Sequence, residues 1–504
     1  MRFNSQGKEG LMLARLKKFG ERDTPLLLQE ETVKGKKREM VLGEEIERGY
    51  DIYVIKDYLP LNRRPKDLAS GLLKLRKEIG TEPLIYCAGA GEINAIAPLA
   101  YAGVDLFDSI ECVRKSREHM LMEPSFGGTQ SCLPFDELFK KNLERVKTEV
   151  ELVKKAIEEK DLRELAEVRS LYDSSLNVFM RAIDEEYHTM ETFSPTAAKL
   201  KALSCYSLSR AEFERYRRRV LERYRKPEHV ETLLILPCSA RKPYSLSKSH
   251  RLFAEHIRNR RALHELIVTS PLGIVPRELE LFFPCANYDI HVSHHWYEDE
   301  KAMIRKMLEE FLKRNEYKKA IVHFDDPFFL DALKGLEVIC VNDRDIRSDK
   351  ALKSLEDATG SGKTRDLIED MSSAALFQFG ENIFEGYRTA GKYPYVKVMD
   401  NEKQIAMLNP ERGGFSLTLA GAERLHEKTD AFDVDIDFYP NTEGTIFAQG
   451  VKKAGENIRI GDEVCVMREK ELIGVGVAMM SYIDMGSAKK GAAVKVRHLV
   501  KNLA

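Results

Sequence analysis

The stretch TLLILPCSARKPYSLSKSH, residues 232–250, begins as a β-strand and ends as a cluster of reactive side chains. Its apolar start, TLLILP (232–237), is followed by three similar runs: LIVTSP (266–271), AIVHF (320–324) and EVICV (337–341). The helical patterns RLFAEHIRNRRALHE and EDEKAMIRKMLEEFLKRN lie between them. Short apolar strands that alternate with helices predict a mostly parallel, doubly wound sheet covered on both faces.

Polar residues follow several of these strands. Ligands of a doubly wound sheet bind at the carboxyl ends of its strands. Cys238 and Ser239 come after the first strand, Ser270 after the second and Asp325 after the third. We therefore expect these side chains to converge on one edge of the sheet.

The loop after the first strand combines a thiol, an ammonium, a phenol, a hydroxyl and an imidazole: Cys238, Lys242, Tyr244, Ser247 and His250. An ammonium nearby lowers the pKa of a thiol, so Lys242 would make Cys238 a thiolate nucleophile. His250 would shuttle a proton, and Tyr244 or Ser247 would hydrogen-bond a developing anion. The alternative is that Cys238 only packs, because buried cysteines are common in protein cores.

Two charged residues farther along are candidates for binding a small substrate. Arg277 and Asp289 would hold its two ends, or would simply pair with one another. The eight cysteines include no CxxC pair, which argues against a zinc ribbon, and no metal or other cofactor is expected. GSGKT (360–364) lacks the first glycine and the upstream strand of a phosphate-binding loop, so residues 348–372 are predicted to be a linker.

Length and charge limit the class of protein. A chain of 504 residues suggests three or four domains of about 150 residues each. The net charge of −1 gives no global attraction for nucleic acid, so RNA would need local basic patches. In the basic helix predicted over 209–226, Arg217 and Arg218 would contact an RNA backbone, unless this is only a solvated face. No apolar run reaches the roughly 20 residues that span a bilayer, so a cytoplasmic location is expected.

The loop pattern P-C-x3-K-P-Y-x2-S-x2-H resembles the signature of the archaeosine synthases (alpha subunit), archaeal tRNA-modifying relatives of tRNA-guanine transglycosylase. GAGEINAIAPLAYAGVDLFDS (89–109) is similar to the late part of the transglycosylase barrel. GGFSLTLAGAERL (413–425) resembles the small domain that precedes PUA in those proteins. The segment from residue 444 onward resembles a PUA domain, with Gly450 and Val451 at a turn expected to contact RNA.

This resemblance implies a multidomain α/β protein with four parts. They are a reduced TIM-barrel-like transglycosylase domain (1–190), a doubly wound α/β catalytic core (200–365), a small α+β domain (370–430) and a PUA β-barrel (431–504). The stretch before Glu82 is too short for the front of a full barrel, and only Cys132 stands where the zinc ligands of transglycosylases are expected. Base exchange is therefore expected to be lost.

The resemblance also implies a reaction. Family members add an amine, expected to be the side-chain nitrogen of free L-lysine, to the nitrile of 7-cyano-7-deazaguanine at position 15 of tRNA. A separate radical-SAM partner enzyme would complete archaeosine from the amidine adduct, and a homodimer is one option for the assembly. Cys238 would form a thioimide with the nitrile, or would only lie beside it. The alternatives are a non-catalytic tRNA-binding scaffold and a transglycosylase that exchanges bases.

Overall fold

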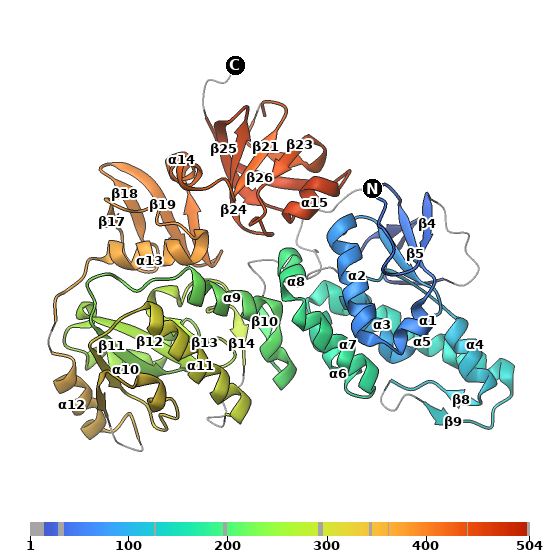
Figure 1. Ribbon diagram of the computed structural model, residues 1–504, viewed down its shortest axis with the longest axis horizontal. Helices are drawn as coiled ribbons and strands as arrows, with labels where there is room; N and C mark the ends of the chain where they lie inside the picture. The colour runs from blue at the N-terminus through green and yellow to red at the C-terminus, as the bar shows by residue number, and fades with distance from the viewer. Residues whose placement is uncertain are drawn as a thin grey trace.

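The computed structural model describes residues 15–28, 35–124, 128–194, 199–290, 296–341, 345–360, 362–440 and 442–500. Four units follow one another along the chain in Figure 1: an N-terminal domain in blue to teal, a central domain in green to olive, a small domain in orange and a C-terminal domain in red. Within these described residues, no helix is long and apolar enough to cross a membrane.

The N-terminal domain contains a sheet of parallel strands flanked by helices. In spatial order the strands are β3 (Leu26–Leu28), β7 (Leu106–Asp108), β6 (Leu84–Cys87), β5 (Ile52–Ile55) and β4 (Lys37–Met40). The helices are α1 (Tyr58–Asn62), α2 (Pro65–Ile79), α3 (Ile93–Tyr101), α4 (Ile110–Arg117), α5 (Phe135–Glu159), α6 (Leu162–Ser170), α7 (Ser174–Glu185) and α8 (Tyr187–Phe193). Two short ribbons complete it: β1 (Lys18–Phe19) with β2 (Arg22–Asp23), and β8 (Met120–Leu121) with β9 (Thr129–Gln130). This is part of a barrel, as predicted.

The central domain is built on a five-stranded sheet. In spatial order its strands are β13 (Gly273–Pro276), β12 (Leu263–Thr269), β11 (Thr232–Pro237), β15 (Lys319–Val322) and β16 (Glu337–Cys340). All pairs are parallel except β12 with β13, which is antiparallel. A separate two-stranded pair joins β10 (Leu200–Lys201) to β14 (Tyr288–Asp289).

The residues of β11 explain why this sheet is covered on both faces. Successive side chains of a strand point to opposite faces, yet Leu233 and Ile235 are as fully buried as Leu234 and Leu236. Leu234 and Leu236 pack with Phe253 of α10 (Lys248–Glu255). The opposite side chains belong to the main core together with α9 (Ala211–Glu222) and α11 (Glu298–Arg314). The doubly wound sheet predicted from the sequence is confirmed.

The linker prediction for residues 348–372 is wrong. This stretch contains helix α12 (Asp349–Ala358), whose Leu352 and Leu355 are buried in the cluster around Leu234. α13 (Leu367–Phe379) begins within it as well. The stretch has a polar composition, which suggested a linker, because α12 is amphipathic and only one of its faces is apolar.

The small domain and the C-terminal domain are β-rich. The small domain has the antiparallel strands β17 (Arg388–Ala390), β18 (Lys397–Asp400), β19 (Lys403–Asn409) and β20 (Gly414–Leu417), with α14 (Leu419–Lys428). The C-terminal sheet contains β22 (Thr445–Phe447), β26 (Ala492–Leu499), β25 (Glu471–Ala478), β24 (Glu463–Arg468), β21 (Asp433–Ile436) and β23 (Val451–Ala454), in that spatial order. Helix α15 (Tyr482–Ser487) belongs to the same domain.

The four domains contact one another in a closed ring. At each junction a buried carboxylate binds a residue of the neighbouring domain: Glu164 with Arg210, Glu280 with Tyr393, Glu463 with Arg412, and Asp484 with Thr81. The last of these joins the C-terminal domain back to the N-terminal one, 403 positions away in the sequence. Because a buried carboxylate is costly without partners, these contacts fix how the domains sit together.

Leu355→Ala tests whether α12 is a packed element of the central domain. Removing this buried side chain should lower the free energy of unfolding by about 2–5 kcal/mol, since a cavity replaces it. Trp296 is the only tryptophan of the chain and packs against Phe328, so its fluorescence in a urea titration reports on this domain. The exposed Lys350→Ala is the matched control. Equal midpoints for the two variants would contradict the packing described here.

Candidate active site

The predicted loop lies at the carboxyl end of β11, beside the end of β12. Cys238 is half-buried, and its thiol lies beside the side chain of Thr269 at the end of β12. The hydroxyl of Tyr288 lies 2.8 Å from Oγ1 of Thr269 and 2.7 Å from the hydroxyl of Tyr244. Nζ of Lys242 stands 4.1 Å from the centre of the Tyr288 ring, a cation–π contact. These five side chains form one cluster. Cys238 is the one member of it that the sequence analysis named among the residues that follow the strands.

The electrostatics of Cys238 differ from the prediction. Burial raises the pKa of this thiol above its ordinary value, and the charge of Lys242 only partly opposes the rise. Burial also lowers the pKa of Lys242. The expected thiolate is therefore wrong for the free protein, because desolvation of a charge outweighs the field of one ammonium. The two shifts bring the thiol and the ammonium closer in acidity, which favours proton transfer between them.

Both ring nitrogens of His250 are hydrogen-bonded within the protein. Its ring is buried, Nε2 donates to the backbone carbonyl of Pro237 at 3.0 Å, and Nδ1 accepts from Arg277 at 2.8 Å. Burial and the charge of Arg277 lower the pKa of His250 to about 3, so the ring is neutral. The predicted proton shuttle is not supported, since both ring nitrogens are already engaged. The ring instead holds the carbonyl immediately before Cys238.

The guanidinium of Arg277 likewise hydrogen-bonds other side chains of the protein. Its guanidinium donates to Glu265 at 2.8 Å, to Glu280 at 2.9 Å and to His250. Neither predicted role is supported, because the guanidinium of Arg277 is occupied by these three groups and does not pair with Asp289. Asp289 is exposed and pairs with Lys199 at 3.0 Å.

A chain of hydrogen bonds connects the small domain to the Cys238 loop. Tyr393 of the small domain donates to Glu280, and Glu280 also accepts from the backbone N–H of Ser245 at 2.8 Å. From Glu280 the chain continues through Arg277 and His250 to the carbonyl of Pro237. The position of the loop therefore depends on a side chain about 150 residues away in sequence.

Of the four remaining predicted residues, three serines make hydrogen bonds within the central domain and one aspartate is exposed. Ser247 caps α10 by accepting from the N–H of His250 at 3.2 Å. Ser239 donates to the carbonyl of Arg241 at 3.0 Å, and Ser270 donates to Glu300 at 2.5 Å. Asp325 is exposed, and its charge acts on Cys238. Asp325 is the one exposed residue of these four.

The basic helix α9 packs within the protein. Arg217 donates to the carbonyl of Pro271 at 2.7 Å and to Glu214, so its predicted RNA contact is not supported. Arg218 is partly exposed, but it also binds Glu214 and stacks on the ring of Tyr187, 4.4 Å away. Both arginines have partners within the protein, and the RNA contact of the partly exposed Arg218 stays a prediction.

The Gly450 turn presents backbone next to an aromatic ring. A Cβ at Gly450 would lie 2.4 Å from the Phe438 ring, so only glycine fits there without a shift. Val451 follows at the start of β23 and is half-buried. Phe438 is itself exposed, so this turn presents backbone and an aromatic face together.

The position of Thr269 at the end of a parallel strand places it among the polar residues expected at this edge of the sheet. Two further side chains of the site had no role predicted from the sequence: Tyr288 and Tyr393. Tyr288 and Tyr393 reach the site from distant segments, and no local pattern marks them.

Comparison with known proteins identifies the family. The chain is 33% identical over 465 residues to the archaeosine synthase subunit alpha of Thermoplasma acidophilum, an alignment that covers 90% of this chain and 89% of that protein. The chain belongs to the archaeosine synthase family. The archaeosine synthase subunit alpha of Methanosarcina acetivorans is 32% identical over 90% of this chain and 80% of its own length. The chain is thus a tRNA-modifying transferase.

Family models match three segments of this archaeosine synthase family member. A domain of unknown function matches residues 213–359, which contain the Cys238 cluster. The patch-forming domain C2 of tRNA-guanine transglycosylase matches residues 370–431, and the PUA domain matches residues 439–500. The tRNA-guanine(15) transglycosylase of Methanobrevibacter smithii is 24% identical over 90% of this chain and 72% of its own length. The predicted multidomain α/β architecture with a C-terminal PUA domain is confirmed.

Alkylation rates should reveal the raised pKa of the Cys238 thiol. Because the thiolate is the reactive form, the alkylation rate at Cys238 should still be rising above pH 9, the ordinary pKa of a cysteine thiol. In Lys242→Met the profile should shift to higher pH, since the ammonium that opposes the rise is gone. Mass spectrometry of the peptide resolves this site, and the exposed Cys132 monitors the reagent. A plateau below pH 8 would contradict the electrostatics described.

Proposed function

We propose that this protein adds the side-chain nitrogen of L-lysine to the nitrile of 7-cyano-7-deazaguanine at position 15 of tRNA, giving an amidine. The observation that carries the proposal is the half-buried thiol of Cys238 with Lys242 beside it. Thiols add readily to nitriles, and the family forms archaeosine in tRNA. The amine donor, the nitrile-bearing base and its position in tRNA come from the family resemblance.

The first step joins Cys238 to the nitrile carbon. As sulfur attacks and an S–C bond forms, the Lys242 ammonium gives a proton to the nitrile nitrogen, and the thiol proton then restores the ammonium. The product is a thioimide. The opposite pKa shifts of the thiol and the amine lower the cost of moving this proton between them.

The second step releases the enzyme. The lysine amine attacks the thioimide carbon, the C–S bond breaks, and the proton lost by the amine restores the thiol. Every atom of nitrile and amine is kept in the amidine, so no oxidant or reductant is required. In direct addition without the thioimide, Cys238 would only orient the base.

Two exposed carboxylates suit the ammonium of the incoming amino acid. The charge of Asp289 acts on Lys242, and that of Asp325 acts on Cys238, so both lie within electrostatic range of the reacting groups. Their exposure leaves them accessible. We propose that they bind the α-ammonium of lysine and thereby set which nitrogen reaches the nitrile.

RNA binding is proposed for the C-terminal domain at the Gly450–Val451 turn. Exposed Phe438 and the close backbone there suit stacking on an unpaired base and approach of a phosphate. The amidine would then pass to a separate radical-SAM enzyme. The words "subunit alpha" in the names of two relatives fit a partner of this kind.

Cys238→Ala should lower incorporation of labelled lysine into cyano-modified tRNA by at least about 10³-fold, because the nucleophile is lost. The exposed Cys205→Ser is the matched control and should keep its activity. Near-normal turnover of Cys238→Ala would exclude the thioimide and leave direct addition. No incorporation by the unaltered protein would favour the scaffold alternative.

Tyr393→Phe should lower kcat of the same reaction by about 2–12-fold, the effect of one hydrogen bond of 0.5–1.5 kcal/mol. The affinity for tRNA should not change, because the lost contact acts on Glu280 and the loop. The exposed Tyr395→Phe is the control on the same segment. A loss of tRNA affinity with unchanged kcat would contradict a positioning role for Tyr393.

A further inference from the structure

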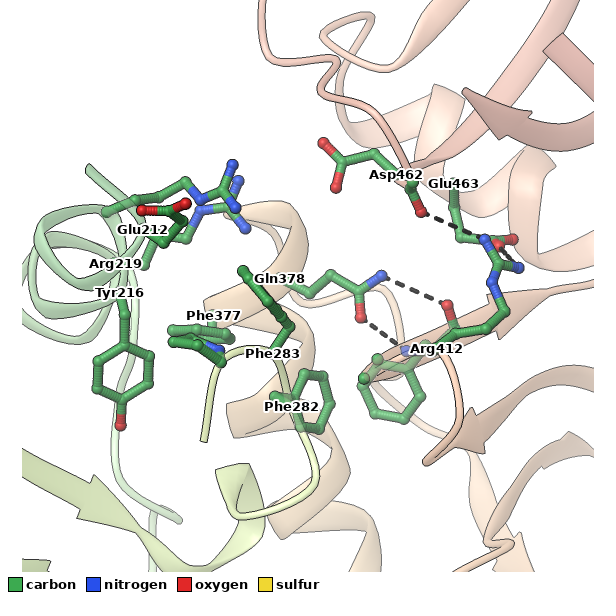
Figure 2. Close-up of a pocket in the computed structure, with 16 residues that line it drawn as sticks. Glu212, Tyr216, Arg219, Phe282, Phe283, Phe377, Gln378, Arg412, Asp462 and Glu463 are labelled. Atoms are coloured by element: carbon green, nitrogen blue, oxygen red, sulfur yellow. Dashed lines mark hydrogen bonds and ion pairs between the residues drawn. The ribbon is translucent and has the colours of Figure 1, made fainter. Parts of the chain in front are cut away.

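A pocket lies where the central, small and C-terminal domains meet, away from Cys238. Its walls come from α9, the loop at Phe283, the end of α13, the turn at Arg412 and the start of β24. Its open space, including the part continuous with solvent, is about 520 Å³. Figure 2 shows Arg219 of the central domain on one side of the pocket and Asp462 of the C-terminal domain on the other.

Two arginines of α9, Arg215 and Arg219, line this pocket, and Arg223 is the C-cap of the same helix. Arg215, Arg219 and Arg223 are spaced four residues apart, which places them on one face of the helix. Like charges at this spacing repel one another, and water screens buried charges poorly. Burial and the charges of Arg223 and Arg215 lower the pKa of Arg219 to about 9. The free protein therefore holds these cations at a cost in free energy.

The guanidinium of Arg215 is poorly satisfied. The residue is 5% exposed, and its Nη2 atom has no hydrogen-bond partner among the residues that the structure describes. Its Nη1 atom makes one long bond of 3.4 Å to the carbonyl of Glu191 and lies 3.8 Å from the carboxylate of the same residue. Nη1 of Arg223 is also buried without a partner in the described part of the chain. Buried N–H groups without acceptors are uncommon, and they mark places where an acceptor binds.

The carboxylates around the pocket are shared with other arginines. Glu191, which lies 3.8 Å from Arg215, also binds Arg459 at 2.7 Å. Glu212 pairs with Arg210 at 3.4 Å through one oxygen, and its other oxygen has no hydrogen-bond partner among the described residues. Glu463 pairs with Arg412 and Arg497. One oxygen of Asp462 accepts the backbone N–H of Arg459 at 2.9 Å, so Asp462 offsets the α9 cations only in part. An excess of positive charge remains on the α9 side.

We propose that this pocket binds a phosphate group, held by Arg215 and Arg219. Guanidinium groups match the oxygens of phosphate with paired hydrogen bonds. The ring of Phe283 lies 5.8 Å from Arg215 and shields that side from water. An RNA backbone and free phosphate offer the same chemistry. The phosphate effect on Tm and the salt dependence of tRNA affinity distinguish the two sources. Since three domains form the walls, an occupant fixes their relative positions. This site is independent of the chemistry proposed for Cys238.

The first measurement uses inorganic phosphate against chloride at equal ionic strength. Phosphate should raise the Tm of the unaltered protein by about 2–4 °C and that of Arg219→Gln by far less. Arg261→Gln removes an exposed arginine outside the pocket and should behave like the unaltered protein. Without phosphate, Arg219→Gln should be at least as stable as the unaltered protein, because a repelling charge is gone. A large destabilisation there would mark a structural arginine and overturn the proposal.

The second measurement is tRNA affinity as a function of salt. If the phosphate belongs to the RNA backbone, Arg219→Gln should lose about tenfold in affinity and about one in the slope of log K against log salt. Loss of the phosphate effect on Tm with unchanged tRNA binding assigns the pocket to free phosphate. Arg219→Lys keeps the charge without the planar fork and should recover part of either effect. Variants that retain both the phosphate effect and the salt slope would overturn the proposal, whatever the activity of Cys238.

Discussion

The guanidinium of Arg277 is the interaction on which the active-site loop depends. It is buried among Glu265 of β12, His250 of α10 and Glu280. Its positive charge compensates the two carboxylates, which could not be buried without a partner. Through His250 it fixes the carbonyl before Cys238. Replacing such a residue would leave buried charges unpaired, so its loss and the loss of a reacting group would look alike in a simple activity assay.

Burial decides the chemistry of this site more than local charge does. Lys242 stands close enough to favour a thiolate, yet the pKa of Cys238 rises, because the thiol is largely removed from water. In the free protein the thiol of Cys238 is therefore protonated. A resting thiol is less open to oxidation and to stray electrophiles than a thiolate, since the thiolate is the reactive form.

The fold was largely predictable from periodicity and the site only in part. Apolar runs such as Leu233–Leu236 read as a strand whatever their partners, and strand ends of a parallel sheet necessarily meet. The roles of His250 and Arg277 could not be predicted, because their partners come from separate elements. The same holds for α9, where a basic sequence faces inward. Composition reports which groups are present, whereas burial and partners decide what they do.

The contact between Asp484 and Thr81 bears on how the protein is made. The two residues are 403 positions apart, and the N–H of Thr81 cannot meet its acceptor until the C-terminal domain has been translated. At about 5–20 residues per second, the matching face of the N-terminal domain stays uncovered for roughly 20–80 s on the ribosome. For that time Thr81 and Glu82 lack the partners that Asp484 and the backbone N–H of Lys489 later supply.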